Sequence, residues 1–124
     1  MEIATVTVKN LYKCLFKNQY SYSLSISLKY QGGEIEDYIN KLQNEYKDKD
    51  IYISNKDTYK NITFYLSTDI DIIYDNKKSN INKLDKIINS KIKNNYVYDL
   101  VIKPYISKDN KSIRFKLLKI KISI

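Results

Sequence analysis

Histidine and tryptophan are absent from this chain of 124 residues, and cysteine, proline and arginine occur once each. Without histidine the commonest general base of enzymes is missing, and the single thiol, Cys14, has no imidazole to activate it. One cysteine also excludes an internal disulfide, and the usual zinc ligand sets cannot be assembled within one chain. Two glycines cannot form a phosphate-binding loop. We therefore expect no enzymatic activity, no cofactor and no metal.

Long apolar runs are also lacking, since no stretch approaches the roughly 18 residues of a membrane-spanning helix. The opening Met1-Glu2-Ile3-Ala4 has no basic segment followed by an apolar run, so we expect no signal peptide. A single cysteine is compatible with a reducing compartment. The length suits one domain, residues 1–124, with its own core. We expect it in the cytoplasm, or in the host cytoplasm if the protein is viral.

Tyrosine, in contrast, is abundant: 13 tyrosines accompany 3 phenylalanines. The chain is rich in residues with A/T-rich codons, but Tyr and Phe codons have equal A/T content, so base composition does not explain this ratio. Rings with a polar tip suit surfaces that face both water and a partner, and beside lysine they suit stacking on exposed bases. Half-buried strand positions are the alternative explanation. By pattern, we expect Tyr22, Tyr30, Tyr38, Tyr46 and Tyr98 at the core, and Tyr12, Tyr20, Tyr65 and Tyr105 at the surface.

The net charge of +8 is unevenly distributed along the chain. Residues 1–30 carry four Lys and one Glu, residues 31–75 carry five Lys and ten acids, and residues 76–124 carry twelve Lys, one Arg and three Asp. A basic half of this kind favours an anionic partner, most often nucleic acid. A solvated basic surface without a partner is the alternative.

Hydropathy patterns predict five strands and two helices. Apolar and polar residues alternate, as in half-buried strands, over residues 3–12, 21–30, 61–74, 96–105 and 111–122. In the last of these the alternation slips at Leu118, which predicts a β-bulge, and residues 107–110 suit a hairpin loop. Residues 34–47 and 79–93 carry the apolar stripe of a helix, the second with Ser79 or Asn80 as N-cap.

The order of these elements favours one small barrel. Without an acidic helical segment at 34–60, three strands, a helix and two strands remain, which is the order of the OB-fold. We therefore expect a mostly β protein: a five-stranded OB-fold barrel with a helix between strands 3 and 4 and a helical insertion, residues 34–60, between strands 2 and 3. A ferredoxin-like or other α+β sandwich is the alternative.

Basic and aromatic residues gather in two places that would become the clasping loops of such a barrel. Residues 103–124 carry six Lys and one Arg against Asp109 alone. Lysine tracks phosphates and tyrosine stacks on any base. Ordinary surface charge is the alternative reading of this set. The candidate nucleic-acid contacts are Lys9, Tyr12, Lys13, Phe16, Lys17, Tyr20, Tyr65, Lys103, Tyr105, Lys108, Lys111, Arg114 and Lys116.

The segments Tyr98–Tyr105 and Lys111–Ile120 resemble the closing hairpin of phage-type OB-fold single-stranded DNA-binding proteins, and Thr5–Tyr12 is similar in style to their first strand. The resemblance implies sequence-tolerant binding of single-stranded DNA, rather than RNA, in phage or bacterial DNA replication or recombination. It also implies no cofactor, and frequent homodimers. The basic ending 119–124 departs from the acidic tail by which many such proteins recruit partners, and the middle insertion is a second departure.

Two other functions stay open at this point. The acidic helix 34–47 would suit a protein-interaction module, such as a small phage inhibitor of a host complex. Asp69 and Asp71 share one strand face and would suit Mg²⁺ in a metal-dependent nuclease, although a polar strand face beside a loop is the favoured explanation.

Overall fold

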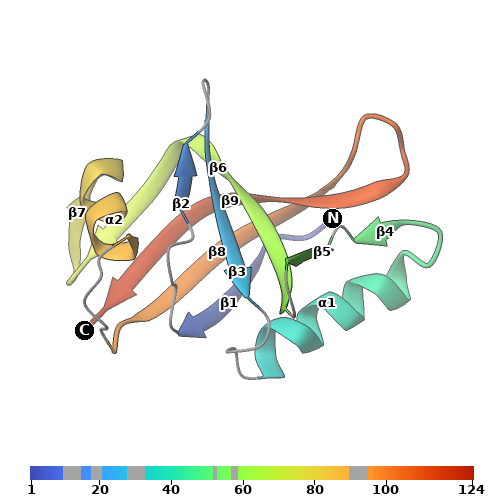
Figure 1. Ribbon diagram of the computed structural model, residues 1–124, viewed down its shortest axis with the longest axis horizontal. Coiled ribbons are helices and arrows are strands. Elements are labelled where there is room, and N and C mark those ends of the chain that lie inside the picture. Colours follow the sequence, from blue (N-terminus) through green and yellow to red (C-terminus); the bar gives the residue numbers. More distant parts are fainter. Residues whose placement is uncertain (10–14, 18–20, 28–32, 52, 57–58, 90–94) are drawn as a thin grey trace.

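The computed structural model is described for residues 1–9, 15–17, 21–27, 33–51, 53–56, 59–89 and 95–124. These residues form one mixed sheet and two helices, so the chain is mostly β (Figure 1). In chain order the elements are β1 (Ala4–Lys9), β2 (Leu15–Lys17), β3 (Tyr22–Ser27), α1 (Gly33–Glu45), β4 (Asp50–Ile51), β5 (Ile53–Lys56), β6 (Tyr59–Tyr74), β7 (Lys77–Ser79), α2 (Ile81–Ile88), β8 (Val97–Ile106) and β9 (Ser112–Ser123).

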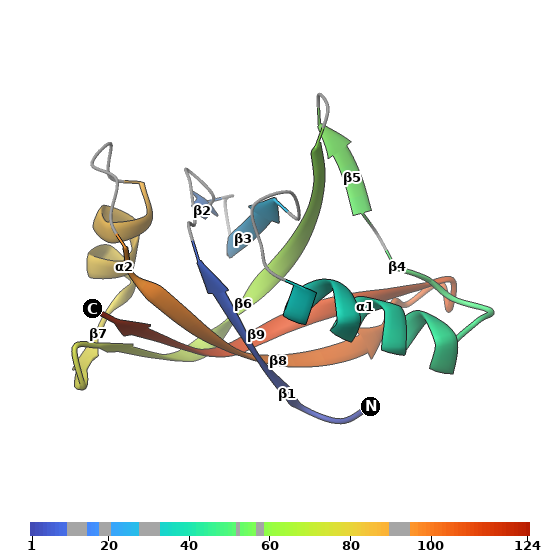
Figure 2. The ribbon, with the colours of Figure 1, turned by 90° about the horizontal axis from the view of Figure 1, so that it is seen from below.

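The main path of the sheet runs β1-β8-β9-β6-β3-β2. Neighbours are antiparallel except β9 and β6, which are parallel. The sheet is bent, and in Figure 2 β6 curves away from β8 and β9 while β2 and β3 lie above them. The two ends of the path, β1 and β2, are consecutive in the chain. The described pairings leave the sheet open between them, so a closed barrel is not confirmed.

The strand and helix predictions are largely confirmed. The five expected strands correspond to β1, β3, β6, β8 and β9, and the two expected helices correspond to α1 and α2. Asn80 is the N-cap of α2, because its side-chain oxygen accepts a hydrogen bond from the backbone N–H of Lys83 at 2.9 Å. Ser79, the other candidate, instead ends β7. The last residues of the expected second helix, 90–93, lie outside the described residues.

The bulge predicted at Leu118 is confirmed. In the pairing of β8 with β9, Val101 lies opposite Lys119 and Ile102 lies opposite Leu117, so Leu118 has no residue opposite it. Alternate side chains of β9 are buried on both sides of this point, with the phase shifted by one residue. The buried set is Ile113, Phe115, Leu117, Ile120 and Ile122.

Four short strands depart from the sequence analysis. The expected connection between the first two strands contains β2, which pairs with β3, and the second half of the insertion 34–60 contains β4 and β5 rather than helix. Residues 77–79 form β7 on β6. Strands of two to four residues are too short to show a period of two, and β4 also depends on a partner, β9, that is distant in the sequence. The prediction that residues 34–60 are a helical insertion is therefore wrong for its second half.

The core lies between the inner face of the sheet and the two helices, which stand at opposite ends of the sheet (Figure 1). The rings of Phe64 and Phe115 face each other at its centre, with their centroids 5.5 Å apart. Each fully buried Leu, Ile or Phe side chain stabilises the fold by about 1.5–3 kcal/mol. Neither of the helices seen in the described residues is long and apolar enough to cross a membrane. The helices contribute Ile35, Ile39 and Leu42 from α1, and Leu84, Ile87 and Ile88 from α2.

The tyrosines expected at the core are found there where they are described. Tyr98 is 1% exposed, and Tyr22, Tyr38 and Tyr46 pack against the core at its margin, whereas Tyr30 lies outside the described residues. The hydroxyl of Tyr38 is buried and has no hydrogen-bond partner among the described residues. Burial, with a smaller contribution from the charge of Glu45, raises the pKa of Tyr38 to about 12.

Replacing Tyr38 by Phe is expected to preserve stability at neutral pH, because the lost hydroxyl makes no hydrogen bond that the fold would miss. In the unfolded chain Tyr38 releases its proton near its ordinary pKa of 10, but in the folded chain it does so only near 12. The contribution of Tyr38 to the free energy of unfolding is therefore fully present below pH 10 and is lost as the pH rises to 12. Urea unfolding of Tyr38→Phe should show a shallower decline over this range than the wild type. Equal declines would contradict the buried, unpartnered hydroxyl.

Candidate nucleic-acid interface

Four strands, in the order β8-β9-β6-β3, present one continuous outer surface at the end of the sheet near the β8–β9 hairpin. Their inner side chains fill the core, so the alternate residues point outward. The strand registers align these outward residues into two rows across the sheet. We call this surface the polar face; it consists of Lys103, Lys116, Tyr65 and Ser23 in one row and Tyr105, Arg114, Thr63 and Ser25 in the other.

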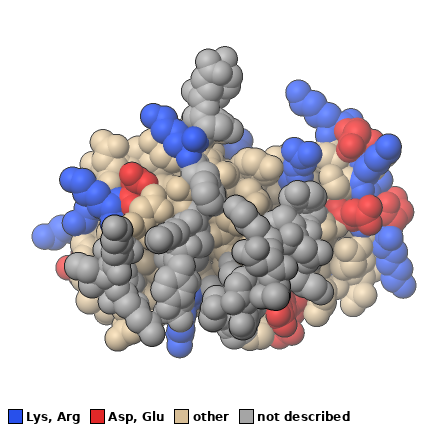
Figure 3. All heavy atoms as spheres, in the orientation of Figure 1, with Lys and Arg blue, Asp and Glu red and all other residues tan. Residues whose placement is uncertain are grey.

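Positive charge is concentrated on the half of the polar face formed by β8 and β9. Lys103, Arg114 and Lys116 are all exposed. Lys103 lies directly opposite Lys116 in the antiparallel pair. Like charges at directly opposed positions destabilise a sheet, so this pair is unfavourable in the free protein and becomes favourable only against an anion. Figure 3 shows further basic side chains at both ends of the molecule, with acidic ones among them at each end.

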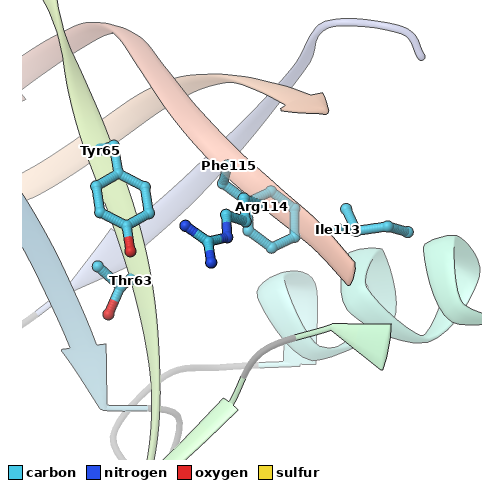
Figure 4. A pocket seen from close by; sticks show the side chains of 5 residues that line it. All are labelled: Thr63, Tyr65, Ile113, Arg114 and Phe115. Atoms are coloured by element: carbon cyan, nitrogen blue, oxygen red, sulfur yellow. The ribbon is translucent and has the colours of Figure 1, made fainter. Parts of the chain in front are cut away.

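Tyr65 contributes to the lining of two pockets. One, of about 330 Å³, is lined by Thr63, Tyr65, Ile113, Arg114 and Phe115, and we call it the Arg114 pocket (Figure 4). The other, of about 560 Å³, we call the Lys116 pocket. Both volumes fall in the range of small-molecule sites. The Lys116 pocket is lined by Ile3, Tyr65, Leu66, Ser67, Asp69, Lys103, Tyr105, Lys116 and Leu118.

Tyr65, Tyr105 and Arg114 are close enough to influence one another electrically. The pKa of Tyr105 is raised, chiefly by partial burial; the positive charge of Arg114 acts against this shift and Tyr65 adds to it. Tyr105 therefore keeps a hydroxyl that donates as well as accepts. The rings of Tyr65 and Tyr105 beside a guanidinium form a surface on which a flat, polar ligand can lie.

The β8–β9 hairpin is held in shape by Ser107. Its hydroxyl donates to the carboxylate of Asp109 and accepts from the backbone N–H of Ser112 at 3.1 Å. The hydrogen bond from Ser107, followed by one from the backbone N–H of Lys111, lowers the pKa of Asp109. The Nζ of Lys49 donates to the carbonyl of Asn110 at 2.8 Å, which ties the loop to the segment after α1. Lys108 and Lys111 are exposed in or beside this loop, as predicted.

The structure brings part of the predicted set together. Tyr65, Lys103, Tyr105, Arg114 and Lys116 share the polar face, and Lys108 and Lys111 extend it at the hairpin. Lys9 is not among them: it pairs with Val97, six residues along β8 from Lys103, which is about 20 Å of strand. The Nζ of Lys17 lies 5.6 Å from the centroid of the Tyr22 ring in the β2–β3 hairpin. Phe16 lies opposite Ser23, and of it only the backbone is described. Tyr12, Lys13 and Tyr20 lie outside the described residues.

Thr63, Ser23 and Ser25 were missed by the sequence analysis, although they share the strand parity of residues that it selected. Thr63 stands two residues from Tyr65 on β6, and the two serines alternate with buried residues on β3. The alternation along each strand therefore placed these residues on the same face, but small hydroxyl side chains are less diagnostic of nucleic-acid binding than lysine and tyrosine.

Asp69 and Asp71, the carboxylates considered as metal ligands, lie next to a hydroxyl and a lysine position. The Asp69 carboxylate accepts a hydrogen bond from the Ser67 hydroxyl, which is the main cause of its lowered pKa. Asp71 lies opposite Lys119 in the β6–β9 pair. Among the described residues, no group of three or more Asp, Glu, His or Cys side chains is arranged to hold a metal ion.

Replacing Ser107 by Ala is expected to destabilise the protein by about 1–3 kcal/mol, because the buried side chain leaves partners unpaired in the hairpin. Thermal unfolding followed by circular dichroism measures this loss. Lys108→Ala, one residue further along and exposed, is the matched control and should change stability by less than about 0.5 kcal/mol. Equal melting temperatures for the two variants would show that the hydroxyl does not hold the loop.

Comparisons with known proteins returned no match: no family model fits this chain, and no curated protein or solved structure is similar to it. The geometry of the polar face and its two pockets is therefore the main basis for assigning a function.

Proposed function

We propose that this protein binds single-stranded DNA on the polar face, without catalysis and without a cofactor. The observation that carries the proposal is the position of Tyr65. Tyr65 lines two pockets, one of which also contains the cation Arg114 and the other the cation Lys116. Stacking on aromatic rings and contacts from lysine or arginine to phosphate are the two components of single-strand binding.

The opposed lysines Lys103 and Lys116 support an anionic ligand. A sheet that served only as a solvated surface would gain stability from an acidic residue at either position. Two cations across from each other fit a chain of phosphates, which neutralises both. Arg114, which lies opposite Tyr105, extends the positively charged surface toward the hairpin.

The strand order supports an OB-fold as the framework. If β1 and β2 are taken as two halves of one first strand, the path becomes 1-4-5-3-2-1, the order of a five-stranded barrel, with α2 between the third and fourth strands. We propose that the sheet is such a barrel, opened where β1 passes into β2. OB-folds bind oligonucleotides on strands 2 and 3, which here are β3 and β6, the strands that carry Ser23 and Tyr65.

Single-stranded rather than double-stranded DNA fits the pockets. A ring such as Tyr65 can stack only on a base whose faces are free, and a paired base inside a duplex offers none. We place the protein, on the resemblance of its closing hairpin, with phage-type single-stranded DNA-binding proteins of replication or recombination. DNA is preferred over RNA on the same ground.

The structure weakens the case for a protein-interaction module built on α1. The apolar stripe of this helix is already used: Ile35, Ile39 and Leu42 are buried, and Tyr38 packs on Phe115 with 6.2 Å between ring centroids. What α1 offers to a partner is its acidic outer surface alone.

Binding of a fluorescein-labelled oligothymidine, measured by anisotropy over a range of salt, tests the proposal. The wild type should bind at about 50 mM salt and weaken steeply as salt rises. Lys103→Ala with Lys116→Ala should reduce the salt slope by about 1.4, since each phosphate contact on a single strand contributes about 0.7. Tyr65→Leu should weaken binding by about 1–3 kcal/mol with the slope unchanged, because stacking does not release ions.

Lys77→Ala with Lys78→Ala is the matched control, because these two exposed lysines lie on β7, at the other end of β6. This control should leave affinity within a factor of about two and the slope nearly unchanged, since distant surface charges act weakly through salt. Absence of wild-type binding at low salt would overturn the proposal. Equal losses in the two double variants would place the contact away from the polar face.

A further inference from the structure

The strands β6 and β9 part from each other within the polar face. Their pairing begins at Phe64 and Phe115 and continues toward the C-terminal end of both strands. Before that point each strand takes a different neighbour: β6 pairs with β5 through Ile62, and β9 pairs with β4 through Ile113. β4 and β5 are consecutive in the chain and thus stand between the diverging strands.

Thr63 and Arg114 are the residues at this divergence. Each stands one position before the first β6–β9 pair and one position after the pairing with the inserted strands. On their facing edges neither has a ladder partner among the described residues. The Arg114 pocket occupies this place, and in Figure 4 the guanidinium of Arg114 reaches across it toward Tyr65 and Thr63 on β6.

Arg114 is the single arginine among 22 basic residues. Lysine serves every other basic position, including those that surround the polar face. A lysine is a flexible point charge, whereas arginine presents a rigid planar fork that donates two parallel hydrogen bonds and stacks on rings. If the pocket needed only positive charge, lysine would meet the need there as it does elsewhere in the chain. The arginine indicates a ligand with two adjacent acceptors in one plane.

We propose that the Arg114 pocket receives one unpaired guanine of the bound strand. The base stacks on the ring of Tyr65, and the Arg114 guanidinium donates hydrogen bonds to its O6 and N7. This inference rests on the proposed function and refines it: one position of an otherwise sequence-tolerant strand is read for base identity.

Guanine fits the donor pattern better than the other bases. Its O6 and N7 are adjacent acceptors, and a pair of hydrogen bonds from arginine to them is the commonest base-specific contact in protein–DNA complexes. Adenine places an amino group beside N7, and thymine offers O4 next to a methyl group. Cytosine has two adjacent acceptors on its pairing edge, but its single ring covers less of Tyr65. A phosphate would leave the ring of Tyr65 uncovered.

Anisotropy titrations with oligothymidines that carry one central dG, dA, dC or 7-deaza-dG test this inference. The wild type should bind the dG strand about 5- to 150-fold more tightly than the dA strand, which corresponds to a bidentate contact worth about 1–3 kcal/mol. Replacing N7 by carbon in 7-deaza-dG should remove most of that preference while leaving stacking intact. Arg114→Lys should bind all four strands alike, with the wild-type salt slope. Lys78→Arg, on β7 at the other end of β6, is the control and should keep the preference.

The outcomes separate the two proposals. If no strand binds, the proposed function fails and this inference fails with it. If all strands bind alike to the wild type, or if cytosine is preferred, single-strand binding stands and the guanine pocket is wrong. If Arg114→Lys weakens every strand equally, Arg114 contacts phosphate and the inference is again wrong. The comparison of dG with 7-deaza-dG uses the wild-type protein alone, so it decides the matter even if a variant does not fold.

Discussion

The parallel pairing of β6 with β9 is the constraint on which the rest of the structure depends. β3, β5 and β7 pair with β6, while β4 and β8 pair with β9. At the start of this pairing the rings of Phe64 and Phe115 lie in contact on the inner side, and Tyr65 and Lys116 lie in register on the outer side. The core and the candidate interface are therefore two sides of one ladder. A shift of one residue in this register would exchange buried and exposed side chains along both strands.

Features encoded by local patterns could be predicted from the sequence. The alternation in β9 predicted which of its residues are buried and where the bulge at Leu118 falls, because each depends only on neighbours within the strand. The stripe of α2 and its cap Asn80 were visible for the same reason. Tyr65 was correctly placed on the outside of β6 by its position between Phe64 and Leu66.

Features that arise from pairing between distant segments could not be predicted. Nothing near Lys103 in the chain reveals that Lys116 lies opposite it, since this register is set where the hairpin pairing begins, at Ile106 and Ile113. Likewise β4 carries no period of its own and is a strand because it pairs with the distant strand β9. The pockets around Tyr65 combine residues from β6, β8 and β9, and so become visible only when the strands are assembled.

The short strands β4 and β5 keep β9 and β6 apart at this point. β4 pairs with the edge of β9, β5 pairs with the edge of β6, and a single residue lies between β4 and β5 in the chain. The width of the opening next to Arg114 thus depends on a segment that is not among the described residues of its lining. Substitutions or length changes in that segment can widen or narrow the opening while every side chain on the polar face stays the same. Ligand preference and general affinity for a charged strand can therefore change independently in this architecture.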